Sequence, residues 1–319
     1  MSSINTNVQA MTALKSLNMT NKALETTQTR ISTGFKVGEA SDNAAYWSIA
    51  TTMRSDNKAL GTVKDALGLG QAKIDTAYTG MNAAIEVVDE IKTKLVAASE
   101  PGVDQSKINK EITALKDQLV SITTSASFSG ENWLANDGAT GTKSIVGSFT
   151  RDASGNVSIG TLDVDVDAVT LTSSDDAANG ILTKDIDADA LLATPTGTAD
   201  NYFLLDTGST TAATGTEIAL SGSNTKDEIG AMVRAVDSIL TQMTDAAADL
   251  GAAKKRVSLQ SEFVSNLSDT ISKGVGTLVD ADMNQESTRL QALQVQQQLG
   301  IQALSIANGN SQTILSLFR

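Results

Sequence analysis

The 319-residue chain contains no cysteine and no histidine. Without cysteine it can form neither disulfide bonds nor a reactive thiolate. Without histidine it lacks the commonest metal ligand and general base, so a Ser-His-Asp triad and an HExxH zinc site are both excluded. We therefore expect no catalytic residues, no metal site and no cofactor.

Proline, aromatic residues and positive charge are also scarce. Two prolines and 3% aromatic residues leave aliphatic side chains to form the core and favour long helices. The net charge of −13 argues against a nucleic-acid partner, since phosphate binding needs a basic surface. The chain has no apolar run of about 18 residues, so we expect no membrane insertion. The first residues do not resemble a cleavable secretory signal peptide either.

The first part of the chain has the apolar spacing of long helices. One helix is predicted from about residue 4 to residue 31, ending at Gly34 as a C-cap glycine would end it. A second follows the N-cap candidates Ser41, Asp42 and Asn43. Its apolar residues alternate in steps of three and four over about five heptads, as in a coiled coil or elongated bundle. They are Leu60, Val63, Leu67, Gly70, Ile74, Ala77, Met81, Ala84, Val88, Ile91 and Leu95.

A third helix, over about 108–122, follows the break at Pro101-Gly102. A fourth begins near Thr225, which has capping-box spacing to Glu228. Its apolar seam, which includes Val233, Leu240 and Ala247, continues for more than 40 residues before Gly274 and Gly276 interrupt it. A last helix is predicted from about residue 283 to residue 318.

Between residues 141 and 225 the helical period is lost. Twelve acidic and three basic residues give this stretch a charge of −9, which favours a solvent-facing position. Short alternating runs separated by turn residues predict strands, and a short helix is predicted near 185–192. The predicted strands lie at 157–159, 162–166, 169–171, 202–205 and 218–220, after a hairpin at 128–134.

The predicted fold is mainly α. Both chain ends form an elongated antiparallel helical bundle or coiled coil, and a small β-rich domain is inserted between them. We expect three domains. Residues 1–42 with 277–319 form a terminal-helix domain, residues 43–140 with 226–276 form a helical rod, and residues 141–225 form a surface-exposed insertion.

The two terminal helices carry few large apolar residues for their length. Because ordering a helix costs backbone entropy, these helices need a partner to be stable. We expect them to pair with each other and then with neighbouring molecules through nine residues: Leu14, Leu17, Leu24, Ile31, Leu290, Leu293, Leu304, Ile314 and Phe318. Four uncharged amides share one side of the last helix and are candidates for lining a water-filled channel: Gln291, Gln294, Gln298 and Gln302.

Several segments resemble the bacterial flagellins. Arg30 to Gly34 is similar to the N-terminal flagellin signature, and Ala40 to Ala45 to the junction of the inner and outer rod domains. Gln297 to Gly300 and Ile314 to Arg319 are similar to the C-terminal signature. The resemblance covers about residues 1–140 and 226–319.

The resemblance implies a homopolymer, the extracellular flagellar filament, whose rotation propels the cell. It also implies export of the unfolded chain through the flagellar type III apparatus without a cleaved signal peptide, and addition at the distal tip. Other flagellins, the filament cap, junction proteins and an export chaperone are the further partners it implies.

Other interpretations of the sequence remain. A hook–filament junction protein shares the terminal helices of a flagellin. An enzyme carried on the filament surface is disfavoured by the absence of histidine and the small insertion. Asp163, Asp165 and Asp167 have the spacing of a calcium loop, but Ala168 replaces the required glycine, so a strand with a wet face explains them better.

Overall fold

The computed structural model describes residues 7–136, 141–195, 197 and 199–317, and describes no side chains at 136 or 310–317. The chain divides into two compact units. The first comprises Met1–Lys58 and Leu267–Arg319, and the second comprises Ala59–Asn266. We call them the terminal unit and the central unit.

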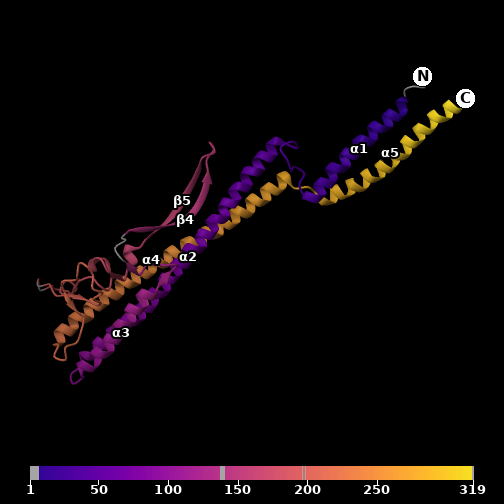
Figure 1. Cartoon of the computed structure of the whole chain (residues 1–319). Coiled ribbons are helices and arrows are strands. Elements are labelled where there is room, and N and C mark those ends of the chain that lie inside the picture. Colours follow the sequence, from indigo (N-terminus) through magenta and orange to yellow (C-terminus); the bar gives the residue numbers. More distant parts are fainter. Residues whose placement is uncertain (1–6, 137–140, 196, 198, 318–319) are drawn as a thin grey trace. The chain divides into compact units, whose positions relative to one another are not determined.

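Five α-helices dominate both units (Figure 1). They are α1 (Val8–Thr33), α2 (Ala44–Ala98), α3 (Gln105–Ser125), α4 (Lys226–Val279) and α5 (Met283–Leu317). All five long helices predicted from the sequence are confirmed. One detail was wrong: α4 continues through Gly274 and Gly276 to Val279, since a glycine weakens a helix without ending it.

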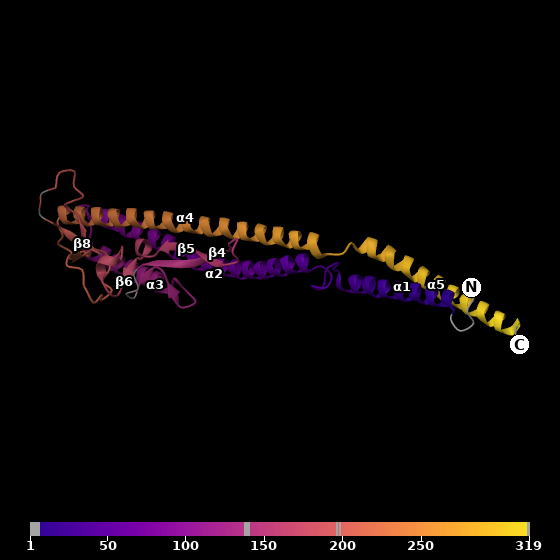
Figure 2. The ribbon, with the colours of Figure 1, turned by 90° about the horizontal axis from the view of Figure 1, so that it is seen from above.

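In the central unit, α2 and α4 run side by side in opposite directions (Figure 2). Lys92 pairs with Asp237 at 2.5 Å and Asp75 with Lys254 at 2.8 Å, so residue numbers rise along one helix as they fall along the other. All eleven seam residues predicted for α2, from Leu60 to Leu95, are buried. On α4 the buried row differs in part, because Met232, Ile239 and Ala246 are buried where Val233, Leu240 and Ala247 were expected.

Short strands fill the segment between α3 and α4. The hairpin predicted at 128–134 is present as β1 (Ser127–Phe128) and β2 (Glu131–Asn132). A second hairpin joins β4 (Thr142–Arg151) to β5 (Val157–Asp165). β3 (Ala135–Asn136) pairs in parallel with β6 (Thr172–Ser173). A three-stranded sheet contains β7 (Ile186–Asp187), β8 (Asn201–Phe203) and β9 (Thr216–Glu217).

In this segment one strand was missed and three local predictions were wrong. The strand β4 was missed because a bulge between Val146 and Ser148 breaks its alternation. The predicted helix at 185–192 is the strand β7 followed by turns, since the Asp187 carboxylate accepts the backbone N–H of Asp189 and so competes with helix formation. The strand predicted at 169–171 overlaps a 3₁₀ helix at Asp167–Val169, and that predicted at 218–220 follows β9.

The β4–β5 hairpin lies against α2 at a glycine. A Cβ on Gly70 would come within 2.5 Å of Ile145 Cγ2, so a side chain at position 70 would collide with the strand. Gly70 therefore permits the close approach of β4 to the helix.

In the terminal unit, the loops α1–α2 and α4–α5 lie next to each other. Phe35 and Asp280 form an isolated antiparallel bridge, and the Ala281 N–H donates to the Gly34 carbonyl at 2.8 Å. Gly34 caps α1 with a left-handed φ of 76°, as the sequence predicted. A small apolar core lies beside these loops and contains Val37, Ala50, Val275 and Val279.

Candidate assembly surface on the terminal helices

The ends of α1 and α5 are fixed by short polar side chains. Asn7 caps α1, because its side-chain oxygen accepts the N–H of Ala10 at 3.0 Å. Asp282 caps α5 in the same way, accepting the N–H of Asn284 at 2.9 Å. Both caps satisfy N–H groups that a helix terminus otherwise leaves unpaired.

Polar contacts join α1 to α5 along the length of the pair. The Asn7 side chain donates to the Ala307 carbonyl at 2.9 Å, and Gln297 donates to the Asn21 side chain at 2.8 Å. Arg30 pairs with the buried Glu286 at 3.2 Å. The contacts occur at both ends and in the middle of the pair, so the helices are antiparallel and in a defined register (Figures 1 and 2).

The predicted contact residues fall into three groups. Leu293 is buried, and five others are half-buried, as expected for a seam between two helices: Leu17, Leu24, Ile31, Leu290 and Leu304. Leu14 is 48% exposed. The side chain of Ile314 and the whole of Phe318 lie outside the described residues. Six of the nine are therefore at least half covered by the terminal helices themselves.

Much of the apolar surface of the pair is left uncovered. Besides Met283 at the start of α5, seven further large apolar side chains are exposed among those described on these two helices: Val8, Met11 and Met19 on α1, and Val295, Leu299, Ile301 and Ile306 on α5. Reasoning from the 3-4 seam missed them, because they lie off the seam. The sequence does contain a signal for them. Apolar residues at positions between those of the seam indicate that the apolar face of each helix is wider than a single stripe.

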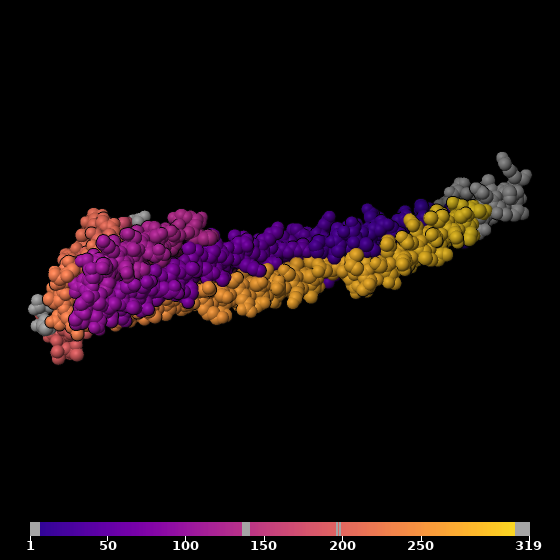
Figure 3. Space-filling view, turned by 90° about the horizontal axis from the view of Figure 1, so that it is seen from below, coloured from indigo at the N-terminus to yellow at the C-terminus, as the bar shows by residue number. Residues whose placement is uncertain are grey.

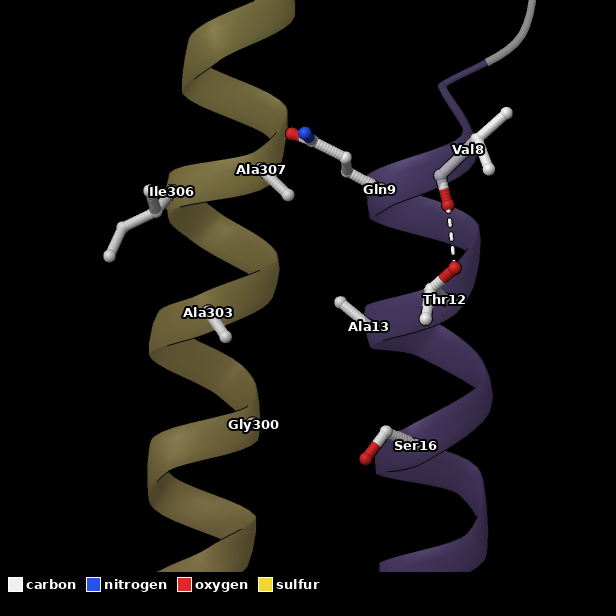
Figure 4. A pocket seen from close by; sticks show the side chains of 9 residues that line it. All are labelled: Val8, Gln9, Thr12, Ala13, Ser16, Gly300, Ala303, Ile306 and Ala307. Carbon is white, nitrogen blue, oxygen red and sulfur yellow. Dashed lines mark hydrogen bonds between the residues drawn. The ribbon is translucent and has the colours of Figure 1, made fainter.

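A hollow of about 610 Å³ runs between the two helices near residue 300. Its walls are built from small side chains. In Figure 4, Ala13 and Ser16 of α1 point toward α5, Ala303 and Ala307 point back, and Ile306 turns away. Gly300 meets Leu17, since a Cβ there would lie 3.2 Å from Leu17 Cδ1. The hollow is thus a shallow apolar groove between the helices.

The other surfaces of the pair differ from the groove. A second hollow, of about 440 Å³, lies on α1 alone and is lined by Met11, Leu14, Met19 and polar neighbours. The four glutamines predicted to share a side, Gln291, Gln294, Gln298 and Gln302, are all exposed on α5. Figure 3 shows the surfaces of α1 and α5 adjoining.

In the α1–α2 loop, backbone N–H groups of Glu39 and Gly38 hold the pKa of the Asp42 carboxyl below its usual range. The residues that the structure describes contain no cluster of acidic side chains suited to a metal ion. Within the same residues, no helix is both long enough and apolar enough to cross a membrane.

Comparison with known protein families gives a match at each helical end of the chain. Residues 4–139 match the model of the bacterial flagellin N-terminal helical region, and residues 233–318 match that of the C-terminal helical region. The two models leave out a middle segment that nearly coincides with the predicted insertion.

Individual relatives match over their whole length. The chain is 59% identical to flagellin C of Rhizobium meliloti over 321 aligned residues, which cover 100% of both chains. It is 47% identical to flagellin A of Rhizobium meliloti and 46% identical to a flagellin of Brucella melitensis, again over 100% of each. The chain belongs to the bacterial flagellin family.

Proposed function

We propose that α1 and α5 form the surface through which copies of this chain polymerise. As a flagellin, the chain is a structural subunit of the bacterial flagellar filament, which lies outside the cell and serves swimming motility. The observation that carries the proposal is the apolar surface left exposed on a pair of helices with few buried residues.

The exposed residues are too numerous to belong to an isolated soluble helix pair. Among the side chains that the structure describes on α1 and α5, nine large apolar ones are exposed, whereas the buried apolar ones are Leu293 and Ala307. Contiguous apolar surface of this kind marks a protein–protein contact. In a homopolymer the available partner is another copy of the same pair.

The groove between α1 and α5 and the larger side chains exposed on α1 are two different surfaces, and their shapes suit a head-to-tail contact. One face presents the groove of Ala13, Ser16, Ala303 and Ala307, and α1 also carries the larger side chains Met11, Leu14 and Met19. An interface between two different surfaces of one molecule does not close on itself and generates an open helical assembly. We place Ile314 and Phe318 in the same contact on the strength of their sequence spacing alone.

The seam residues have an indirect role in this proposal. Leu17, Leu24, Ile31, Leu290, Leu293 and Leu304 hold α1 against α5, and the paired helices then present the outer residues to neighbours. Gln291, Gln294, Gln298 and Gln302 would face a central channel, where uncharged amides would bind a passing chain only weakly. Their exposure on α5 supports that placement.

The division into terminal-helix domain, rod and surface insertion belongs to the same proposal. So do export of the unfolded chain without a cleaved signal peptide, chaperone binding, and addition at the tip beneath a cap. Other flagellins and junction proteins would be neighbours in the filament. Family membership supports these steps, and no observation favours the hook–filament junction role or a catalytic one.

Electron microscopy of purified protein after seeding tests the proposal. The full chain should form long filaments, and chains lacking residues 1–30 or 290–319 should form none. The truncated chains should keep the helical circular dichroism of the central unit, because the residues of that unit are retained. Intact filaments from either truncation would contradict the proposal.

A truncation removes most of a helix together with its exposed surface, so a point variant that alters the surface alone is a more specific test. Leu299→Asp places a charge on an exposed apolar position of α5, and should abolish filaments while leaving the unfolding of the monomer unchanged. The matched control, Leu299→Met, keeps the apolar surface and should polymerise normally.

A further inference from the structure

Two asparagines of the chain are followed directly by glycine: Asn179 by Gly180, and Asn308 by Gly309. An asparagine before a glycine can lose its side-chain amide without an enzyme, because the glycine has no side chain to hinder attack of its backbone nitrogen on the amide carbon. The attack requires that this nitrogen first leave its own hydrogen bond. The two pairs lie in different local structures, so the fold determines which of them can react.

The pair Asn308–Gly309 lies inside the long helix α5. Within an α-helix each backbone N–H is bonded to the carbonyl four residues earlier. Because helix formation is cooperative, freeing the nitrogen of Gly309 requires that the helix open on both sides of it. This pair is therefore protected wherever α5 is folded.

The pair Asn179–Gly180 lies instead at the end of a single 3₁₀ turn, η2 (Ala177–Asn179), in the central unit. The Gly180 N–H donates to the Ala177 carbonyl at 3.3 Å, which is longer than most N–H···O hydrogen bonds. A 3₁₀ turn has poorer hydrogen-bond geometry than an α-helix, and a turn this short has no neighbouring turns to stabilise it. Local opening of one long hydrogen bond is therefore enough to free the nitrogen of Gly180.

The side chain of Asn179 is accessible as well. It is exposed, and it makes no hydrogen bond to any residue that the structure describes. It lines an open hollow of about 390 Å³, so water reaches the amide. No contact therefore holds the amide carbon away from the nitrogen of Gly180.

The packing around Gly180 explains why a labile pair is present here. A Cβ at this position would lie 2.3 Å from Thr183 Oγ1, 2.9 Å from the Leu171 carbonyl oxygen and 3.0 Å from the Ser173 backbone nitrogen. Two of these three atoms belong to the backbone and cannot turn aside as a side chain can. The fold therefore requires the glycine that makes Asn179 reactive.

We propose that Asn179 is a site of spontaneous deamidation in the folded chain. The Gly180 nitrogen, after losing its proton to the solvent, attacks the side-chain carbon of Asn179. The bond from that carbon to the amide nitrogen breaks, and the amide group takes up a proton and leaves as ammonia. One water molecule then opens the five-membered succinimide at either carbonyl and gives aspartate or isoaspartate at position 179. No atom is oxidised or reduced.

The conversion changes both the charge and the backbone of the chain. Each converted chain gains one negative charge beyond its net charge of −13. Isoaspartate also lengthens the main chain by one carbon, directly before Ile181 and Leu182, whose N–H groups donate to the carbonyls of Thr170 and Leu171. We therefore expect the isoaspartate form to loosen the segment of short strands between α3 and α4.

Peptide mass spectrometry of the full chain after prolonged incubation tests the proposal. In guanidinium chloride both asparagines should convert at similar rates, because the unfolded chain leaves both pairs open. In the folded chain Asn308 should be strongly protected, whereas Asn179 should convert several-fold faster than Asn308. Asn179→Gln should abolish the conversion at 179, since glutamine would have to close a less favourable six-membered ring. An Asn179 that keeps its amide, or that folding protects as strongly as Asn308, would overturn the proposal.

A second pair of variants tests whether the 3₁₀ turn controls the reaction. The Asp176 side chain caps η2 by accepting the N–H of Ala178 at 3.0 Å. Asp176→Ala removes this cap and should speed the conversion of Asn179 in the folded chain several-fold. Asp176→Asn removes the charge but keeps a side chain that can cap the turn, so its rate should stay near that of the wild type. An unchanged rate in Asp176→Ala would overturn the assignment of the reaction to opening of this turn.

Discussion

The central and terminal units use the same 3-4 apolar spacing with different results. On α2 the seam residues from Leu67 to Leu95 are almost fully buried, because α3, α4 and the β4–β5 hairpin add layers around them. On α1 and α5 the seam residues are mostly half-buried, and other apolar residues are exposed. Spacing therefore shows which face of a helix is apolar, and the number of packed neighbours decides whether one copy of the chain can cover it.

The largest expected effect is the loss of a buried side chain from the central unit, compared with the loss of an exposed side chain from the terminal unit. Ile91→Ala removes a fully buried side chain of the central unit and should lower the free energy of unfolding by about 2–5 kcal/mol. Leu14→Ala removes an exposed side chain of the terminal unit and should leave that free energy nearly unchanged. Urea unfolding followed by circular dichroism measures both.

The exposed residue should matter for the stability of the filament, although it does not matter for the stability of the monomer. If Leu14 contacts a neighbouring copy, Leu14→Ala filaments should dissociate at a lower temperature than wild-type filaments. Equal loss of monomer stability in Ile91→Ala and Leu14→Ala would refute the contrast between the units.

A smaller effect sharpens the account of the central unit. Gly68 and Gly70 lie two residues apart on α2, yet a Cβ meets nothing within 4 Å at Gly68 and meets Ile145 at Gly70. Gly68→Ala should stabilise the helix by up to about 1 kcal/mol. Gly70→Ala should destabilise the unit by about 1 kcal/mol, because the cost of overpacking exceeds the same gain in helix propensity.

Chemical denaturation of the two single variants measures this difference, and each serves as the control for the other. If both variants were stabilised equally, the close contact between β4 and α2 would be refuted.

The long helices could be predicted because their period repeats over many turns and their caps are local. Thr225 and Glu228 form the predicted reciprocal hydrogen bonds, and Gly34 has the predicted left-handed conformation. The role of Gly70 could not be predicted, since it depends on a strand more than 70 residues away in the sequence.

The strand-rich segment was harder to predict for a related reason. Its strands are mostly two or three residues long, and aspartate side chains fix many of its turns. Such side-chain hydrogen bonds compete with helix and strand without leaving a period in the sequence. The seam of the terminal helices was found from spacing, but their exposed surface was not, because exposure depends on how few elements pack there.

The smallest expected effect concerns the polar loop of the terminal unit. The N–H groups of Glu39 and Gly38 lower the pKa of Asp42 in the folded chain below the value of about 3.9 for an unfolded aspartate. A lowered pKa means that the charged carboxylate stabilises the fold at pH values above about 4, and that this contribution is lost as the pH falls through the folded pKa. Asp42→Asn lacks the charge at every pH, so it should lose less stability than the wild type between pH 6 and pH 3.

The difference should be small, because Asp42 is exposed and water screens its charge. Measuring the Asp42 pKa by NMR, together with the unfolding free energies of both chains at the two pH values, gives the result. If Asp42 titrated at its ordinary pKa, or if both chains lost equal stability, the carboxylate would not be what orders this loop. The loop would then be ordered by its other contacts, such as the Phe35–Asp280 bridge and the hydrogen bond from Ala281 to Gly34.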